Sequence, residues 1–143
     1  DFAVSEDSDL LAYHCKKVIY KLQTNGMGDL LEIKEILKQL NMDKDRFTDM
    51  CIAAGCDYLH NIEGIGIIRA KKIVWEQPQY VNILQSMQNA PSDYSKCFAE
   101  TTIIFQNQTV INPSTYKTVP LNEFKDFMEK KVQQLCGKYL FHK

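Results

Sequence analysis

Apolar residues recur along the chain with two periods, which together predict many helices and a few strands. Alternating apolar and polar residues predict a half-buried strand at 16–22, and short apolar runs predict strands at 2–4 and 30–33. LLAYHC, at 10–15, predicts a short helix, and Asn25-Gly26 predicts a turn. With so few strands, we do not expect a complete sheet.

Helical spacing dominates the rest of the chain. A helix is predicted at 34–40. Asp43 is a suitable N-cap for the next helix, Gly55 is a suitable stop, and another helix is expected to start near Gly66. The positions predicted to face the core are Phe47, Met50, Cys51 and Ala54, then Ala70, Ile73 and Val74.

Two further helices, a hairpin and a last helix are predicted downstream. Pro78 suits the first turn of a helix, a hairpin is expected around Asn112-Pro113, and Gly137 ends the last helix. The predicted core positions are Tyr80, Ile83, Leu84 and Met87, then Tyr94, Cys97, Phe98, Thr101 and Phe105, and finally Phe124, Phe127, Met128, Val132 and Leu135.

Composition narrows the class of protein. A chain of 143 residues, 45% of them hydrophobic, is expected to form one domain with a real core. Its five cysteines are odd in number and scattered, and no signal-peptide pattern or membrane-spanning apolar run is present, so we expect an intracellular, reduced protein without a membrane partner. The formal net charge of −1 means that a nucleic-acid partner would need a local basic patch.

Cys51, Cys56 and His60 raise the question of a zinc site. Their spacing is loose and no fourth ligand lies nearby, so thiols buried in the core are the favoured interpretation.

Asp7 and Asp9 are the first candidates for chemistry. If the strand end is extended, the i, i+2 spacing points both carboxylates toward one cation. Alternatively, Asp9 caps the following helix while Glu6 and Asp7 are solvated loop charges, and the pair alone favours this second interpretation.

Asp57 lies between two predicted helices, where an aspartate is ordinarily an N-cap or turn former. Mg²⁺ prefers oxygen ligands, and two such cations about 4 Å apart serve phosphodiester hydrolysis. Three aspartates can supply part of such a site but not all of it.

The turn between these helices offers a second kind of chemistry. Gly64 and Gly66 let the backbone approach a ligand, and the N–H groups that open the next helix attract an anion such as phosphate. Arg69 and Lys72 lie one turn apart and can hold neighbouring phosphates. The alternative is a tight helix–helix turn with solvated basic residues.

Taken together, EDSDLLAY (6–13), GCDYL (55–59) and GIGIIRAKKI (64–73) resemble the flap endonuclease superfamily, especially its exonuclease 1 branch. The segments at 98–122 and CGKYL at 136–140 extend this resemblance over nearly the whole chain. It implies an α/β fold, namely the helix-rich C-terminal part of a 5′-nuclease (PIN-like) core with a helix–three-turn–helix module that grips duplex DNA.

The resemblance also implies a division of the chain and a set of site residues. Residues 1–42 would form the edge of the α/β core, about 43–76 the helix–three-turn–helix module, and 77–143 the C-terminal helices and hairpin. The implied catalytic metal ligands are Asp7, Asp9 and Asp57, and the implied DNA contacts are Gly64, Ile65, Gly66, Arg69 and Lys72.

A monovalent cation, K⁺, is implied in the helical turn at Ala54, Asn61 and Ile65. Members of this branch often have serine at the first two positions, so this chain departs from the pattern there.

The family's other metal-binding carboxylates, first strands and helical arch precede an EDSD-type segment, so the resemblance implies that residues 1–143 hold only part of a two-Mg²⁺ site and are inactive alone. We expect part of a nuclear, Mg²⁺-dependent 5′–3′ DNA exonuclease or flap endonuclease that acts in repair or replication on duplex DNA with a 5′ end, nick or flap. The rival is a catalytically inactive duplex-binding module, and a more distant one is an α/β domain unrelated to nucleic acid.

Overall fold

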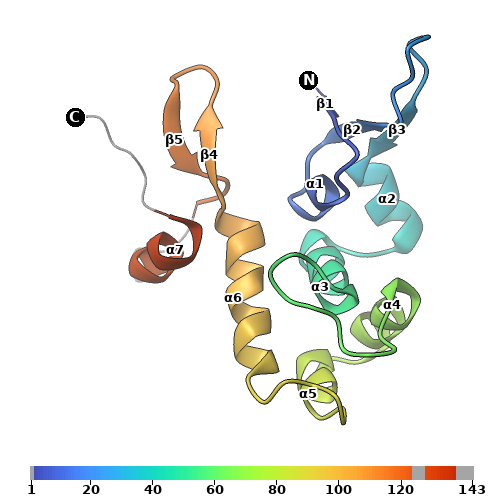
Figure 1. The fold of residues 1–143 in the computed structure, drawn as a ribbon, viewed down its shortest axis with the longest axis vertical. Helices are drawn as coiled ribbons and strands as arrows, with labels where there is room; N and C mark the ends of the chain where they lie inside the picture. The colour runs from blue at the N-terminus through green and yellow to red at the C-terminus, as the bar shows by residue number, and fades with distance from the viewer. Residues whose placement is uncertain (1, 124–127, 138–143) are drawn as a thin grey trace.

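The computed structural model describes residues 2–123 and 128–137, and its elements follow the predicted order (Figure 1). The strands are β1 (Ala3–Val4), β2 (Lys17–Tyr20), β3 (Asp29–Glu32), β4 (Thr109–Asn112) and β5 (Lys117–Pro120). The helices are α1 (Asp9–Ala12), α2 (Ile33–Leu40), α3 (Lys44–Ala54), α4 (Ile67–Glu76), α5 (Tyr80–Gln85), α6 (Tyr94–Asn107) and α7 (Glu129–Cys136). The predicted mixed α/β, helix-rich class is confirmed.

The first three strands form one small sheet. β1 runs parallel to β2, and β2 pairs antiparallel with β3, with Val4 beside Ile19 and Ile19 beside Leu30. The next row holds Val18, which is fully buried. Because neighbouring residues of a strand point to opposite faces, the Val18 row faces inward and the Val4–Ile19–Leu30 row faces outward.

Helix α3 forms the centre of the core because other helices cover it on more than one side. It packs against α4 and α6, and α6 in turn packs against α5 and α7 (Figure 1). Phe47 and Met50 are buried as predicted, whereas Cys51 and Ala54 are only half-buried. Ile52 and Ala53 are fully buried instead, so the prediction of one buried face was too narrow.

Helix ends follow the predicted caps with one exception. The Asp43 carboxylate accepts a hydrogen bond from the Arg46 backbone N–H at 2.8 Å, and α3 ends at Gly55, whose φ is +105°. The prediction for Pro78 was wrong: it lies in a turn before α5, because the first helical hydrogen bond runs from the Ile83 N–H to the Gln79 carbonyl.

The C-terminal part carries the predicted hairpin and last helix. β4 and β5 pair antiparallel, and Gly137 ends α7 with a φ of +85°. Val132 is buried, whereas the predicted core positions Phe124 and Phe127 lie outside the described residues. Within the part of the chain that the structure describes, no helix has the length and apolar character needed to span a membrane.

Candidate functional site

The three candidate aspartates come from three different segments of the chain. Asp7 lies in the loop after β1, Asp9 is the first residue of α1, and Asp57 lies in the tight turn that follows α3. The assumption of an extended 7–9 segment was wrong, because β1 ends at Val4 and α1 has already begun at Asp9. The shared direction inferred from strand spacing therefore does not apply.

The N-cap of α1 is Ser8, without a side-chain capping hydrogen bond, and the carboxylate that meets the start of the helix is that of Asp7 rather than Asp9. One Asp7 carboxylate oxygen accepts the backbone N–H of Asp9 at 2.9 Å, while the Asp7 N–H donates to the Ser5 hydroxyl at 3.0 Å. Glu6 is also engaged, because its carboxylate accepts the Lys21 N–H at 2.8 Å. The alternative in which Asp9 caps α1 is thus wrong, and the loop is held by its own side chains.

The aspartates nevertheless share one electrostatic environment. Burial raises the pKa of Asp9, and the negative charges of Asp7 and Asp57 raise it further. Asp57 therefore lies close enough to Asp9 to repel its charge, although 48 positions separate them in the sequence. Repulsion among neighbouring carboxylates is relieved by a bound cation.

The donor set suits Mg²⁺ better than zinc. Carboxylate oxygens are the hard ligands that Mg²⁺ prefers, and it commonly takes only one or two of them, with water and phosphate completing its coordination. Across residues 2–123 and 128–137, no three or more His, Cys, Asp or Glu side chains are gathered closely enough to hold a metal. The three aspartates therefore fit Mg²⁺ in chemistry but are not already gathered at ligand distances.

The zinc candidates behave as ordinary thiols. Cys51 and Cys56 are half-buried and unpaired, and burial raises the pKa of Cys51 to about 12. Since a metal ligand must be a thiolate, this environment opposes zinc binding. Both thiols pack against the core, as predicted, but they are half-buried rather than fully buried.

Two tyrosines connect the segments that carry Asp9 and Asp57. The Tyr13 and Tyr58 hydroxyls lie 2.8 Å apart in a hydrogen bond, and both rings contact Phe105, with centroids 4.7 and 5.6 Å away. Burial and the Tyr58 hydrogen bond raise the pKa of Tyr13. The sequence interpretation missed this connection, although Tyr58 next to Asp57 was a signal that could have suggested it.

The turn before α4 is built around one glycine in the left-handed region. Gly64 has a φ of +80°, and the buried residue Ile65 donates its N–H to the Ile62 carbonyl at 2.8 Å. Gly66 is the N-cap of α4, and a Cβ there would meet no atom within 4 Å. A ligand can therefore approach the opening N–H groups of α4 closely, as phosphate binding requires.

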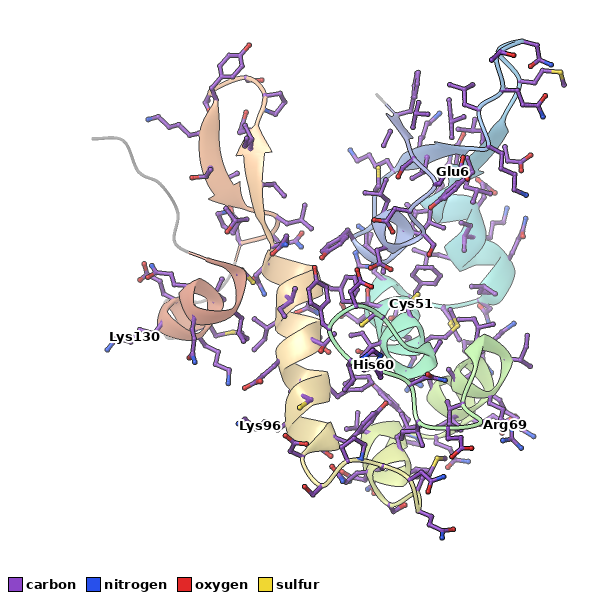
Figure 2. All side chains as sticks on the ribbon, in the orientation of Figure 1. Glu6, Cys51, His60, Arg69, Lys96 and Lys130 are labelled. Atoms are coloured by element: carbon purple, nitrogen blue, oxygen red, sulfur yellow. The ribbon has the colours of Figure 1, made fainter. Side chains whose placement is uncertain are left out.

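Arg69 and Lys72 line the same hollow beside this turn. The hollow has a volume of about 460 Å³, and it is bordered by Glu63, Met87 and Asn89 as well. Arg69 is exposed at the periphery of α4 (Figure 2) and donates from Nη1 to the Gly64 carbonyl at 3.0 Å. A guanidinium has five donors, so this contact leaves others free for an anion.

The side chains at the positions implied for K⁺ do not direct an oxygen toward Ile65. Asn61 Nδ2 donates to the Ile65 carbonyl at 2.9 Å, and Ala54 is the last residue of α3 and has no side-chain oxygen. As arranged here, an N–H group rather than a side-chain oxygen faces the Ile65 carbonyl oxygen, so the side chains at these positions do not fit the ion.

Comparisons with known proteins agree on one family. Residues 1–57 match the family model of the XPG I-region. The chain is 34% identical to exonuclease 1 of Danio rerio over 94% of its own length, and 33% identical to flap endonuclease 1 of Candida albicans over 78%. The solved structure of flap endonuclease-1 from Methanococcus jannaschii superposes on 97% of the chain with a TM-score of 0.62 and 26% identity.

The fold is therefore that of part of a 5′-nuclease core. The chain belongs to the flap endonuclease (XPG) superfamily and is similar to its exonuclease 1 branch. It spans 18% of the Danio rerio relative, 32% of the Candida albicans relative and 41% of the archaeal structure, so the resemblance concerns a part of those proteins.

Proposed function

We propose that the chain is part of a Mg²⁺-dependent, 5′-end-directed DNA nuclease of exonuclease 1 type, which acts in the nucleus in repair or replication. Its substrate would be duplex DNA with a 5′ end, nick or flap. The observation that supports this most directly is the position of Asp57. It shares an electrostatic environment with Asp9 and lies only seven residues before Gly64, in the turn that precedes α4.

Each group has a distinct part in the proposed reaction. Asp7, Asp9 and Asp57 would hold Mg²⁺, and when bound, two such ions activate a water molecule and stabilise the charge on the phosphate oxygens. The N–H groups that open α4 would hold a duplex phosphate beside Gly66, and Arg69 would neutralise a neighbouring phosphate. These contacts carry no base information, so they support recognition of duplex form rather than of sequence.

The proposal is tested in a full-length nuclease that contains this chain. Asp57→Ala should reduce 5′-flap cleavage in Mg²⁺ by at least about a hundredfold while leaving duplex affinity measured in Ca²⁺ within about twofold, because Asp57 would hold metal rather than DNA. Asp93→Ala, which removes an exposed carboxylate at the start of α6, is the matched control. Cleavage by Asp57→Ala near the wild-type rate would reject the assignment.

A duplex-binding module without catalysis is the second candidate. The turn before α4 supports it, because hydrogen bonds from Asn61 and Arg69 and the packing of α3 against α4 hold this turn without help from the aspartates. Under this alternative, the protein would bind duplex DNA but would not cleave it, whichever variant or metal was used. Mg²⁺-dependent cleavage by the full-length protein, lost in Asp57→Ala, would exclude it.

A further inference from the structure

Two backbone carbonyls of the turn that precedes α4 are already occupied by side-chain donors. The Gly64 carbonyl accepts Arg69 Nη1 at 3.0 Å, and the Ile65 carbonyl accepts Asn61 Nδ2 at 2.9 Å. A backbone carbonyl in a tight turn needs a hydrogen-bond donor or a cation as its partner. Here the two side chains are the partners, a role that an ion could otherwise fill.

The position of Asn61 is fixed by the end of α3. A Cβ on Gly55 would come within 3.0 Å of both the Asn61 Cβ and its backbone nitrogen, so the two residues pack as closely as backbone allows. Ile65, whose carbonyl accepts the amide, is itself buried. The donor and the acceptor are therefore both held in place.

Only one orientation of the Asn61 amide is favourable without an ion. With Nδ2 toward Ile65, 2.9 Å from its carbonyl oxygen, an N–H group meets a carbonyl; with Oδ1 there, the two oxygens would repel one another unless one cation were bound by both. We propose that the Asn61 amide replaces a monovalent cation in this turn, so that the module folds and binds duplex DNA equally well in K⁺ and Na⁺. The statement about DNA rests on the proposed function; the statement about folding does not.

The test compares chloride salts of K⁺, Na⁺ and tetramethylammonium at equal ionic strength. For the chain of residues 1–143, the melting temperature should be the same in all three. Duplex affinity, measured by fluorescence anisotropy in Ca²⁺, should agree within about twofold between K⁺ and Na⁺. A melting temperature or an affinity that rises specifically with K⁺ would overturn the proposal.

Asn61→Asp converts the donor into an acceptor of the same shape. It should lower the melting temperature, and K⁺ should restore part of the loss because both oxygens can bind the same ion. We expect the substitution to change the unfolding equilibrium constant by about fivefold, as for one net hydrogen bond. Asn82→Asp makes the same change of charge at an exposed position of α5 and should respond equally to all three salts. An Asn61→Asp protein as stable as wild type in tetramethylammonium would also overturn the proposal.

The two claims fail separately. If the wild-type chain bound no duplex in any salt, the proposed function would be contradicted, while the melting comparison would still decide whether Asn61 replaces a cation. If duplex binding were strong but K⁺-dependent, the proposed function would stand and the role of Asn61 would not.

Discussion

Asp49 is a carboxylate inside the core, on the side of α3 that faces α5. It accepts a hydrogen bond from the Tyr80 hydroxyl, and the Arg46 guanidinium lies over the Tyr80 ring, 5.7 Å from its centroid. Burial raises the pKa of Asp49, the charge of Asp45 adds to this, and the hydrogen bond from Tyr80 opposes it. Protonation of Asp49 is therefore more favourable in the folded state than in the unfolded chain.

This shift fixes the sign of a pH effect. A folded-state pKa above the ordinary aspartate value of 3.8 means that the folded protein binds the proton more tightly than the unfolded chain. This tighter binding of the proton stabilises the folded protein when the pH is below the ordinary aspartate pKa. The stabilisation is lost as the pH rises through the folded-state pKa of Asp49. We expect Asp49→Asn, which keeps an acceptor for Tyr80, to raise the melting temperature at pH 7 and to remove this decline.

Melting temperatures measured from pH 3 to 7 check this expectation. The exposed residue Asp93 supplies the matched control, because Asp93→Asn removes the same charge without removing a buried carboxylate. If wild type and Asp49→Asn had the same profile of melting temperature against pH, the buried carboxylate would not titrate with folding.

At the scale of elements, the junction from α3 into the turn depends on Gly55. Its φ of +105° is unfavourable for other residues, and an added Cβ would meet Asn61 at 3.0 Å. Gly55→Ala should therefore lower the free energy of unfolding by at least about 2 kcal/mol. Gly26→Ala is the control, since Gly26 also has a positive φ, +83°, but its Cβ would meet nothing within 4 Å.

Denaturant unfolding of the two variants separates the steric effect from the backbone effect. If Gly55→Ala cost no more than Gly26→Ala, the close packing of Gly55 against Asn61 would be unimportant for stability.

Helix α4 carries the basic residues proposed to contact DNA. Lys72 lines the hollow beside the turn, whereas Lys71 does not, although both lie on the same helix. Lys72→Ala should weaken binding about equally for every duplex sequence and flatten the slope of log affinity against log salt by about one unit. Lys71→Ala should leave the slope nearly unaltered. Equal slopes for wild type and Lys72→Ala would remove this residue from the interface.

The sequence predicted elements better than it predicted contacts. The Asp43 cap, the Gly55 stop and the strand alternation at 16–22 are local signals, and the structure confirms them. The Asn61 contact with Ile65 and the Tyr13 contact with Tyr58 were missed, because an amide or a hydroxyl has no preferred partner until the fold places one nearby.

The same limit applies to the aspartates. Motif resemblance led to Asp7, Asp9 and Asp57. The structure places Asp7 and Asp57 within electrostatic reach of Asp9, whereas the strand geometry used to link Asp7 with Asp9 was wrong. Two residues of separation are too few to tell an extended segment from the first turn of a helix. The assignment of these residues as metal ligands remains a prediction.

For the molecule as a whole, the outward face of the small sheet is apolar. Val4, Ile19 and Leu30 form one row across the three strands, and Val4 and Leu30 are 52% and 53% exposed. Phe2 and Met27 add further exposed apolar surface near this sheet. Such a contiguous patch favours association.

We expect the isolated chain to self-associate through this face at micromolar concentration. The double variant Val4→Lys with Leu30→Lys should sediment as a monomer under the same conditions, because two charges would have to be buried on association. Ile111→Lys, at an exposed position of β4, should associate like wild type. A wild-type chain that is monomeric by analytical ultracentrifugation would contradict this prediction.

The hydrogen bond between Tyr13 and Tyr58 has a mechanical consequence. It links α1, which begins at Asp9, to the turn that holds Asp57, and Phe105 of α6 supports both rings. A force applied to one segment is thus transmitted to the other, so the two acidic positions move together rather than independently. A ligand that draws Asp57 toward Asp9 must move the Tyr13–Tyr58 pair against Phe105 of α6. The packing of these rings therefore limits how closely the two aspartates can approach one another.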